Sequence, residues 1–165
     1  MTIKYDSEDL SAHNKRALRK LERAIAISQG QFSLILVCCN YPPVGLQVVN
    51  QLQEFSSIQI QKVVLRPSTS TLFTNIATVV EEPPPQALMV FGLDSVVAID
   101  QVLSATNLVR NEFSKQLPCP LVLWINDKVL QKLIRVAPDF KSWAANPIRF
   151  EVPKNQPLEL TAITA

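Results

Sequence analysis

The sequence predicts a three-layer α/β/α sandwich built on a mainly parallel five-stranded sheet. Short, continuously apolar runs of strand length are typical of strands that helices cover on both faces. Stretches of helical period separate these runs, and a helix between two strands of one sheet implies a right-handed crossover to a parallel strand. With 165 residues, 47% of them apolar, the chain can bury one full hydrophobic core.

Five segments have the length and composition of strands. Residues 32–39, 87–91 and 121–125 are continuously apolar, as expected of strands buried on both faces. Residues 58–65 begin with strict alternation of apolar and polar positions, so we expect this strand to lie nearer an edge of the sheet. Residues 148–152 form the fifth predicted strand.

Amphipathic helices are predicted before and between the strands. Gly30 ends the first helix, and Pro43 suits the first turn of the second. A proline-rich stretch at 81–85 ends the third. Asn126 or Asp127 can cap the last, because both side chains accept hydrogen bonds from helix amides. The predicted helical stretches are 7–29, 43–55, 72–80, 99–113 and 127–134.

These elements predict one α/β domain over residues 1–152. An N-terminal helix within 1–30 precedes alternating strands and helices over 31–152, and a loose tail is expected at 153–165. No apolar run reaches the ~20 residues that a membrane span needs. The polar start of the chain has no signal-peptide core. The sequence therefore favours a cytoplasmic protein without a membrane partner.

Charge, histidine and cysteine content exclude several function classes. A net charge of +2 is too small to indicate a nucleic-acid partner. The single histidine, His13, cannot supply a multi-histidine metal site, and we expect it on the solvated surface. Cys38 and Cys39 are neighbours in a predicted strand and point to opposite faces, and Cys119 adds no zinc-ligand spacing. No metal and no cofactor are expected.

Sites of open parallel α/β sheets form beyond the carboxyl ends of the strands. After the first predicted strand, residues 40–46 read NYPPVGL. A P-loop at this place needs several glycines, which let backbone amides approach phosphate, and a lysine. This stretch has one glycine, no lysine and two prolines without amide donors. The chain therefore lacks a Walker A motif. If a nucleotide binds at this place, Asn40 and Gly45 are the residues of the stretch that could contact it.

Two further candidates follow the third and fourth predicted strands. Asp94 comes shortly after an apolar strand, where P-loop enzymes carry a magnesium-coordinating acid. Asn126 holds the position of the sensor residue in ATPases of the AAA type. Helix capping explains each of them as well. With Asn40 and Gly45, they make up a predicted vestigial nucleotide site.

Residues 135–143 (RVAPDFKSW) form the most unusual stretch of the chain. They lead from the last predicted helix toward the last strand, with Phe140 and Trp143 three residues apart. The two aromatic side chains either anchor this segment in the core or form a patch that binds a partner. Both are therefore candidate interaction residues.

A family resemblance rests on this region. Residues 120–150 (PLVLWINDKVLQKLIRVAPDFKSWAANPIRF) resemble a segment of bacterial, notably cyanobacterial, proteins of the STAND-NTPase and tetratricopeptide-repeat type. Their apolar strand ends in tryptophan and leads through a helix to an APDF-x-SW turn and a short strand. The resemblance spans residues 31–151. It implies an N-terminal signalling or scaffold domain with a P-loop-NTPase-like layout, here degenerate because the phosphate loop is missing.

The sequence thus predicts a non-catalytic, P-loop-like protein-interaction or signalling module, forming the N-terminal part of a larger protein. Its expected partners are other proteins or other domains of the same polypeptide, and self-association is left open. The alternative is a divergent nucleotide-binding domain of a STAND or AAA-type NTPase, which would use backbone amides near Gly45, with Asn40, Arg66 and Asp94 around the ligand. An enzyme that uses Asp94 with Tyr41 or Cys38 is a third hypothesis, although no base is paired with a nucleophile at a recognisable spacing.

Overall fold

The structure, a computed structural model, describes residues 11–152 and confirms the predicted fold class. Five strands form one sheet in the order β2-β3-β4-β1-β5, and all four pairings are parallel. The second strand along the chain lies at an edge, as its alternating sequence predicts. The strands are β1 (Ser33–Cys39), β2 (Ile60–Val64), β3 (Ala87–Phe91), β4 (Pro120–Ile125) and β5 (Ile148–Phe150).

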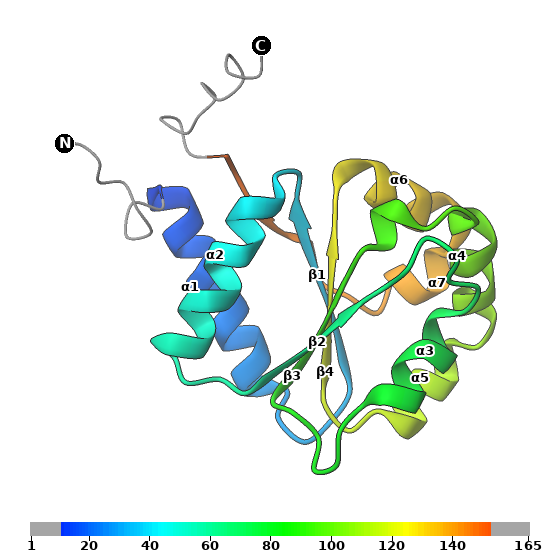
Figure 1. Ribbon diagram of the computed structural model, residues 1–165, viewed down its shortest axis with the longest axis horizontal. Helices are drawn as coiled ribbons and strands as arrows, with labels where there is room; N and C mark the ends of the chain where they lie inside the picture. Colours follow the sequence, from blue (N-terminus) through cyan, green and yellow to red (C-terminus); the bar gives the residue numbers. More distant parts are fainter. Residues whose placement is uncertain (1–10, 153–165) are drawn as a thin grey trace.

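Helices cover both faces of the sheet (Figure 1). Among the described elements, α1 (Ala12–Ile27) and α2 (Pro42–Glu54) lie on one face. The other face carries α3 (Leu72–Val79), the 3-10 turn η2 (Leu93–Ser95), α4 (Ile99–Leu108), α5 (Arg110–Gln116), α6 (Asp127–Val136) and α7 (Pro138–Lys141). This arrangement is the expected α/β/α sandwich. Residues 1–10 and the predicted tail at 153–165 lie outside the described residues.

The long helix predicted over 99–113 is wrong in one respect, because the structure divides it into α4 and α5. The break falls at Val109, whose backbone (φ −103°, ψ 18°) leaves the helical range. After the break, Phe113 of α5 is fully buried in the core. Its ring lies 5.1 Å, centroid to centroid, from the rings of both Phe73 and Phe140. Aromatic contacts thus hold α5 against the core, and the apolar period of the sequence gives no sign of the break.

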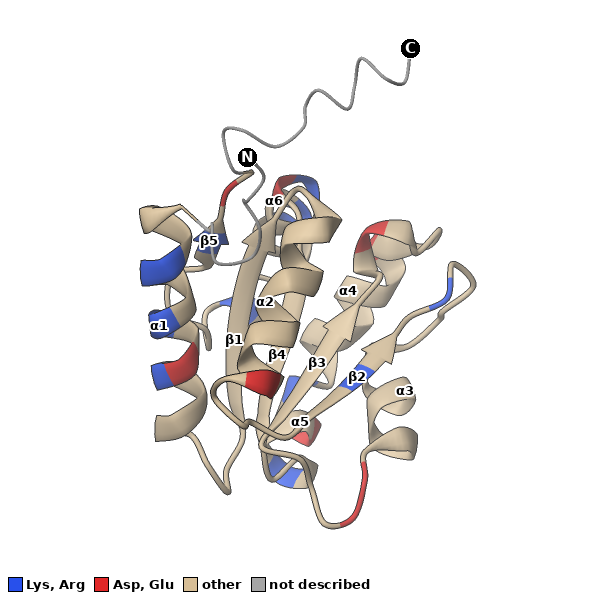
Figure 2. Cartoon of the chain, turned by 60° about the vertical axis from the view of Figure 1, so that its left-hand side comes forward, with Lys and Arg blue, Asp and Glu red and all other residues tan. Residues whose placement is uncertain are grey.

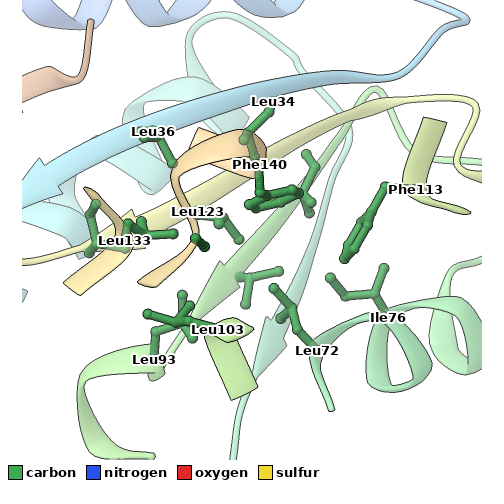
Figure 3. Close-up of a cluster of buried hydrophobic side chains, with 14 of the residues drawn as sticks. Leu34, Leu36, Leu72, Ile76, Leu93, Leu103, Phe113, Leu123, Leu133 and Phe140 are labelled. Atoms are coloured by element: carbon green, nitrogen blue, oxygen red, sulfur yellow. The ribbon is translucent and has the colours of Figure 1, made fainter. Parts of the chain in front are cut away.

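Two hydrophobic cores form because successive residues of a strand point to opposite faces. All six residues of β4 are buried. Leu121, Leu123 and Ile125 enter the core under α3 to α7, part of which is shown in Figure 3. Val122 and Trp124 enter the core under α1 and α2. The continuously apolar sequence of β4 thus serves both layers.

Helix α1 is tied to β5 by hydrogen bonds. The side-chain amide of Asn14 is fully buried, and it both donates to and accepts from the backbone of Glu151, each at 2.8 Å. His13 Nε2 lies 2.8 Å from the carbonyl oxygen of Arg149. His13 lies at the surface, as expected, with 40% of its side chain exposed, and it also contacts the backbone of an edge strand.

The two aromatic residues offered as an interaction patch differ in exposure. Phe140 is fully buried against Phe113, so its side chain does not reach the surface. Trp143 keeps 38% of its surface exposed while its ring contacts Phe32 and Phe140. The segment is therefore anchored in the core through Phe140, and of its two aromatic side chains only Trp143 is accessible to a partner.

We predict that Phe140→Ala lowers the free energy of unfolding by about 3–5 kcal/mol, because it removes a buried aromatic side chain and leaves a cavity. Urea denaturation followed by circular dichroism measures the loss. Trp143→Ala is the matched control and should cost clearly less, because that side chain is partly exposed. Equal losses for the two variants would contradict the assignment of Phe140 as the anchor.

Candidate functional site

The strand order creates a crevice at the carboxyl ends of β1 and β4. These two strands are neighbours. The helix that follows β1 lies on one face of the sheet, and the helix that follows β4 lies on the other (Figure 1). In open α/β sheets, ligands bind where neighbouring strands send their connections to opposite faces. The architecture thus places the candidate site at this edge.

The four predicted nucleotide-site residues come together here. Asn40, Gly45, Asp94 and Asn126 all line one pocket of about 580 Å³, which we call the edge pocket. They reach it from the ends of β1, β3 and β4 and from α2, because the carboxyl ends of parallel strands meet at one edge. Much of its wall is apolar and is formed by Leu46, Val64, Phe91 and Trp124.

The connection from β1 to α2 has no room for a phosphate loop. Only Asn40 and Tyr41 separate the end of β1 from the first residue of α2. Pro42 and Pro43 begin the helix without amide donors. The next amide, of Val44, already donates to the carbonyl oxygen of Tyr41 at 3.0 Å. The backbone at this position therefore offers no cradle of free amides to an anion.

Gly45 lies against the indole ring of Trp124. A Cβ atom at this position would be 3.4 Å from that ring, which is an ordinary van der Waals distance, so packing alone does not require glycine here. Trp124 is also stacked on Phe91, with centroids 5.4 Å apart, so the three residues form one wall of the edge pocket.

A polar network lies beside the pocket at the ends of β1, β4 and β5. Its centre is the carboxylate of Asp127, which accepts hydrogen bonds from Arg149 Nη1 at 2.8 Å and from Asn40 Nδ2 at 2.9 Å. The Asn40 side-chain oxygen accepts from the Asp127 amide at 2.9 Å. The thiol of Cys38 donates to the same carboxylate at 3.2 Å. We call these four residues the Asp127 network.

The network shifts the acidities of its members. The Arg149 guanidinium, followed by the Asn40 amide, lowers the pKa of Asp127 from 3.8 to about 2. Burial, reinforced by the hydrogen bond to Asp127, raises the pKa of the Cys38 thiol to about 11. At neutral pH, Asp127 is therefore charged and Cys38 is a protonated thiol. The hypothesis that Cys38 acts as a nucleophile is disfavoured, because the thiolate is the reactive form.

Sequence reasoning named Asp127 only as a helix cap and did not single out Arg149. The signal for Arg149 is a lone basic residue inside a short apolar strand, β5, and β1 alone separates this strand from β4, which Asp127 follows. The cap itself is Asn126, whose Oδ1 accepts from the Val129 amide at 2.9 Å. That bond confirms the capping interpretation of Asn126 and occupies part of its side chain.

Asp94 lies on η2, at the end of β3, and its side chain is exposed. The capping interpretation of Asp94 is wrong, because η2 begins after Gly92 and α4 begins after Ala98. Gly92 makes the turn possible with a left-handed backbone (φ 93°). A Cβ there would lie 2.8 Å from the carbonyl oxygen of Leu65.

Among the described residues, no group of three or more histidine, cysteine or acidic side chains is arranged to hold a metal ion. Within the same range, no helix combines the length and the apolar character required for crossing a bilayer.

We predict that Gly92→Ala destabilises the fold by about 1–3 kcal/mol or more, because a left-handed alanine is strained and its Cβ meets backbone. Gly30→Ala is the matched control, since Gly30 also has a positive φ of 80° but nothing within 4 Å of a Cβ. Urea denaturation should show the larger loss at Gly92. Equal losses would mean that the close contact between a Cβ atom at position 92 and the Leu65 backbone does not lower the stability.

We predict that Asp127→Asn lowers the free energy of unfolding at pH 7. A carboxyl group whose pKa falls on folding stabilises the protein above its ordinary pKa of 3.8, and this contribution disappears as the pH falls to about 2. The difference between the variant and the parent should shrink over that interval, as measured by urea denaturation. Asp94→Asn, at the same edge but outside the network, is the matched control and should cost clearly less at pH 7, because the Asp94 side chain is exposed. A pH-independent loss at Asp127 would contradict the assignment.

No protein-family model and no curated protein matches this sequence. Among solved structures, the chain is similar to the Aeropyrum pernix ORC2 protein in its ADP form, with a TM-score of 0.50 and 7% sequence identity. The match covers 84% of this chain and 47% of that one, so the chain spans about half the length of its structural neighbour. At this identity the likeness shows the fold alone, and the fold is P-loop-like.

Proposed function

We propose that this chain is a non-catalytic, P-loop-like interaction module that acts through contacts with other proteins or with other domains of its own polypeptide. The observation that carries the proposal is the Asp127 network. At the end of β1, where a P-loop enzyme surrounds phosphate with amides and a lysine, this chain has a carboxylate held in place by its neighbours.

Three features of that position oppose phosphate binding. The two-residue connection cannot wrap around an anion. The prolines at the start of α2 remove two of the amides that normally point to one. The Asp127 carboxylate stays ionised at neutral pH, and a second negative charge beside it is unfavourable. Arg149, the nearest cation of the network, is already paired with Asp127.

The proposal extends to the wider protein through the sequence segment at 135–143. Its resemblance to STAND-type and tetratricopeptide-repeat proteins supports an N-terminal signalling or scaffold domain. In the structure, the segment holds its neighbourhood together by burying Phe140, and it leaves Trp143 partly exposed. An ATPase or repeat region following Ala165 in the full reading frame would support this placement.

A divergent nucleotide-binding domain is the second candidate. One observation favours it, which is that Asn40, Gly45, Asp94 and Asn126 line a single pocket of about 580 Å³. The similar ORC2 structure is described in its ADP form. Such a ligand would contact the apolar walls through its base, because the end of β1 offers no free cradle for its phosphates.

We predict that the purified protein neither hydrolyses ATP nor binds ATP, ADP or GTP at millimolar concentration with magnesium present. Phosphate release and isothermal titration calorimetry measure the two properties. If the parent protein gives a heat of nucleotide binding and Asp94→Ala does not, the second candidate is favoured. If the parent protein hydrolyses ATP and the same variant does not, the non-catalytic proposal is overturned.

A further inference from the structure

The two edge strands of the sheet differ in their contacts with the rest of the fold. At the β5 edge, the side chains of His13 and Asn14 on α1 contact the backbone of Arg149 and Glu151. At the opposite edge, β3 is the one strand within residues 11–152 that pairs with β2. Sheet edges left open in this way are sites where another strand can add, and most proteins cover or interrupt them.

The register shows which backbone groups of β2 are open. The Leu65 amide donates to the Phe91 carbonyl at 2.9 Å, and the Gln59 carbonyl accepts from the Ala87 amide at 3.3 Å. The backbone amide and carbonyl groups of the odd-numbered residues of this segment therefore point toward β3. The amide and carbonyl groups of the alternate residues point away from the sheet, and these residues are Ile60, Lys62 and Val64.

The side chains of these alternate residues share the face of the sheet that carries α1 and α2. Figure 2 shows both helices in front of the sheet, with β3 and β2 beside α2 and a basic band on β2. Lys62 and Val64 line the edge pocket, and Val64 is 71% exposed. Ile60 lines a second pocket of about 460 Å³, together with Glu81 and Pro83. The outer side of β2 is thus bordered by two pockets.

We propose that β2 accepts an extended segment of a protein partner as a sixth strand. Backbone groups of that segment would pair with Ile60, Lys62 and Val64, which is the usual source of affinity in strand addition. An apolar side chain opposite Val64 would enter the edge pocket beside Phe91, and an acidic side chain two residues away would lie opposite Lys62. The partner is therefore a peptide segment with an acidic and an apolar residue on one face.

Charge argues against a second copy of this chain as the occupant. A two-fold pairing of β2 with itself, centred on the middle of the strand, sets Lys62 opposite the same residue of the partner, and like charges in that position are destabilising. An acidic residue there forms a favourable cross-strand pair instead. Lys62 therefore disfavours this pairing and favours a segment with an acidic residue at that place.

The inference rests on the protein-contact part of the proposed function, but the two fail separately. Nucleotide titration and phosphate release test the non-catalytic part, whereas strand addition is tested with peptides and without nucleotide. A nucleotide-binding result would leave the strand proposal standing, and a negative peptide result would leave the Asp127 network and its meaning unchanged.

The test uses capped seven-residue peptides of serine and threonine that carry Glu-Thr-Val or Val-Thr-Glu at the centre, so that both strand directions are sampled. Amide hydrogen exchange in the ¹⁵N-labelled protein is followed by NMR at millimolar peptide. The amides of Ile60, Lys62 and Val64 should exchange fast in the free protein and become protected with peptide. Those of Gln61, Val63 and Leu65 pair with β3 and should be protected from the start.

Two variants test the recognition. Lys62→Glu should lower the affinity for the acidic peptide about fivefold and raise the affinity for peptides with lysine in place of glutamate. Val64→Pro removes an outward amide but no bond to β3, so the fold should persist while peptide binding is lost. Phe55→Ser, at another exposed apolar residue, is the matched control and should bind as the parent does.

Several results would overturn the proposal. The first is that neither peptide protects the three outward amides at millimolar concentration. The second is that Lys62→Glu leaves the charge preference unchanged. The third is that the same amides are protected without peptide in proportion to protein concentration, which would identify a second copy as the occupant.

Discussion

The central strands of this sheet must be covered on both faces, and the rest of the structure depends on that constraint. β4 is buried along its whole length, and its successive side chains enter two different cores. Helices are therefore required on both sides of the sheet. Of the described helices, only α1 and α2 occupy one side of the sheet, where they share a core with residues of β1, β3 and β4. The edge strand β2 has no fully buried residue, so it does not need the same cover.

At the carboxyl edge, the fold keeps the geometry of a binding site while its residues serve another purpose. Asp127 and Arg149 join the ends of β1, β4 and β5 through Asn40 and Cys38. Asn126 caps α6 through its side chain. Asn40 and Asn126, two of the residues expected to hold a nucleotide, are thus engaged in holding the sheet and its helices together, whereas Asp94 is exposed.

Most of the fold could be predicted because apolar runs identify buried strands whatever their order. The convergence of Asn40, Asp94 and Asn126 was predictable for the same reason, since carboxyl ends of parallel strands share one edge. The pairing of Arg149 with Asp127 was not, because it depends on β5 lying beside β1, and no local pattern specifies that order. The break at Val109 was hidden by an apolar period that continues through it, and the burial of Phe140 depends on contacts with Phe113 from a distant helix.

The two-residue connection between β1 and α2 limits how this domain can change. A phosphate-binding loop needs additional backbone at that point as well as different side chains. Single substitutions alter side chains and leave the length of the chain unchanged, so no series of them builds such a loop. A phosphate-binding loop here would require an insertion between a buried strand and a packed helix, together with release of Asp127 from its partners. A designer who wants a nucleotide switch on this scaffold must therefore rebuild the backbone first.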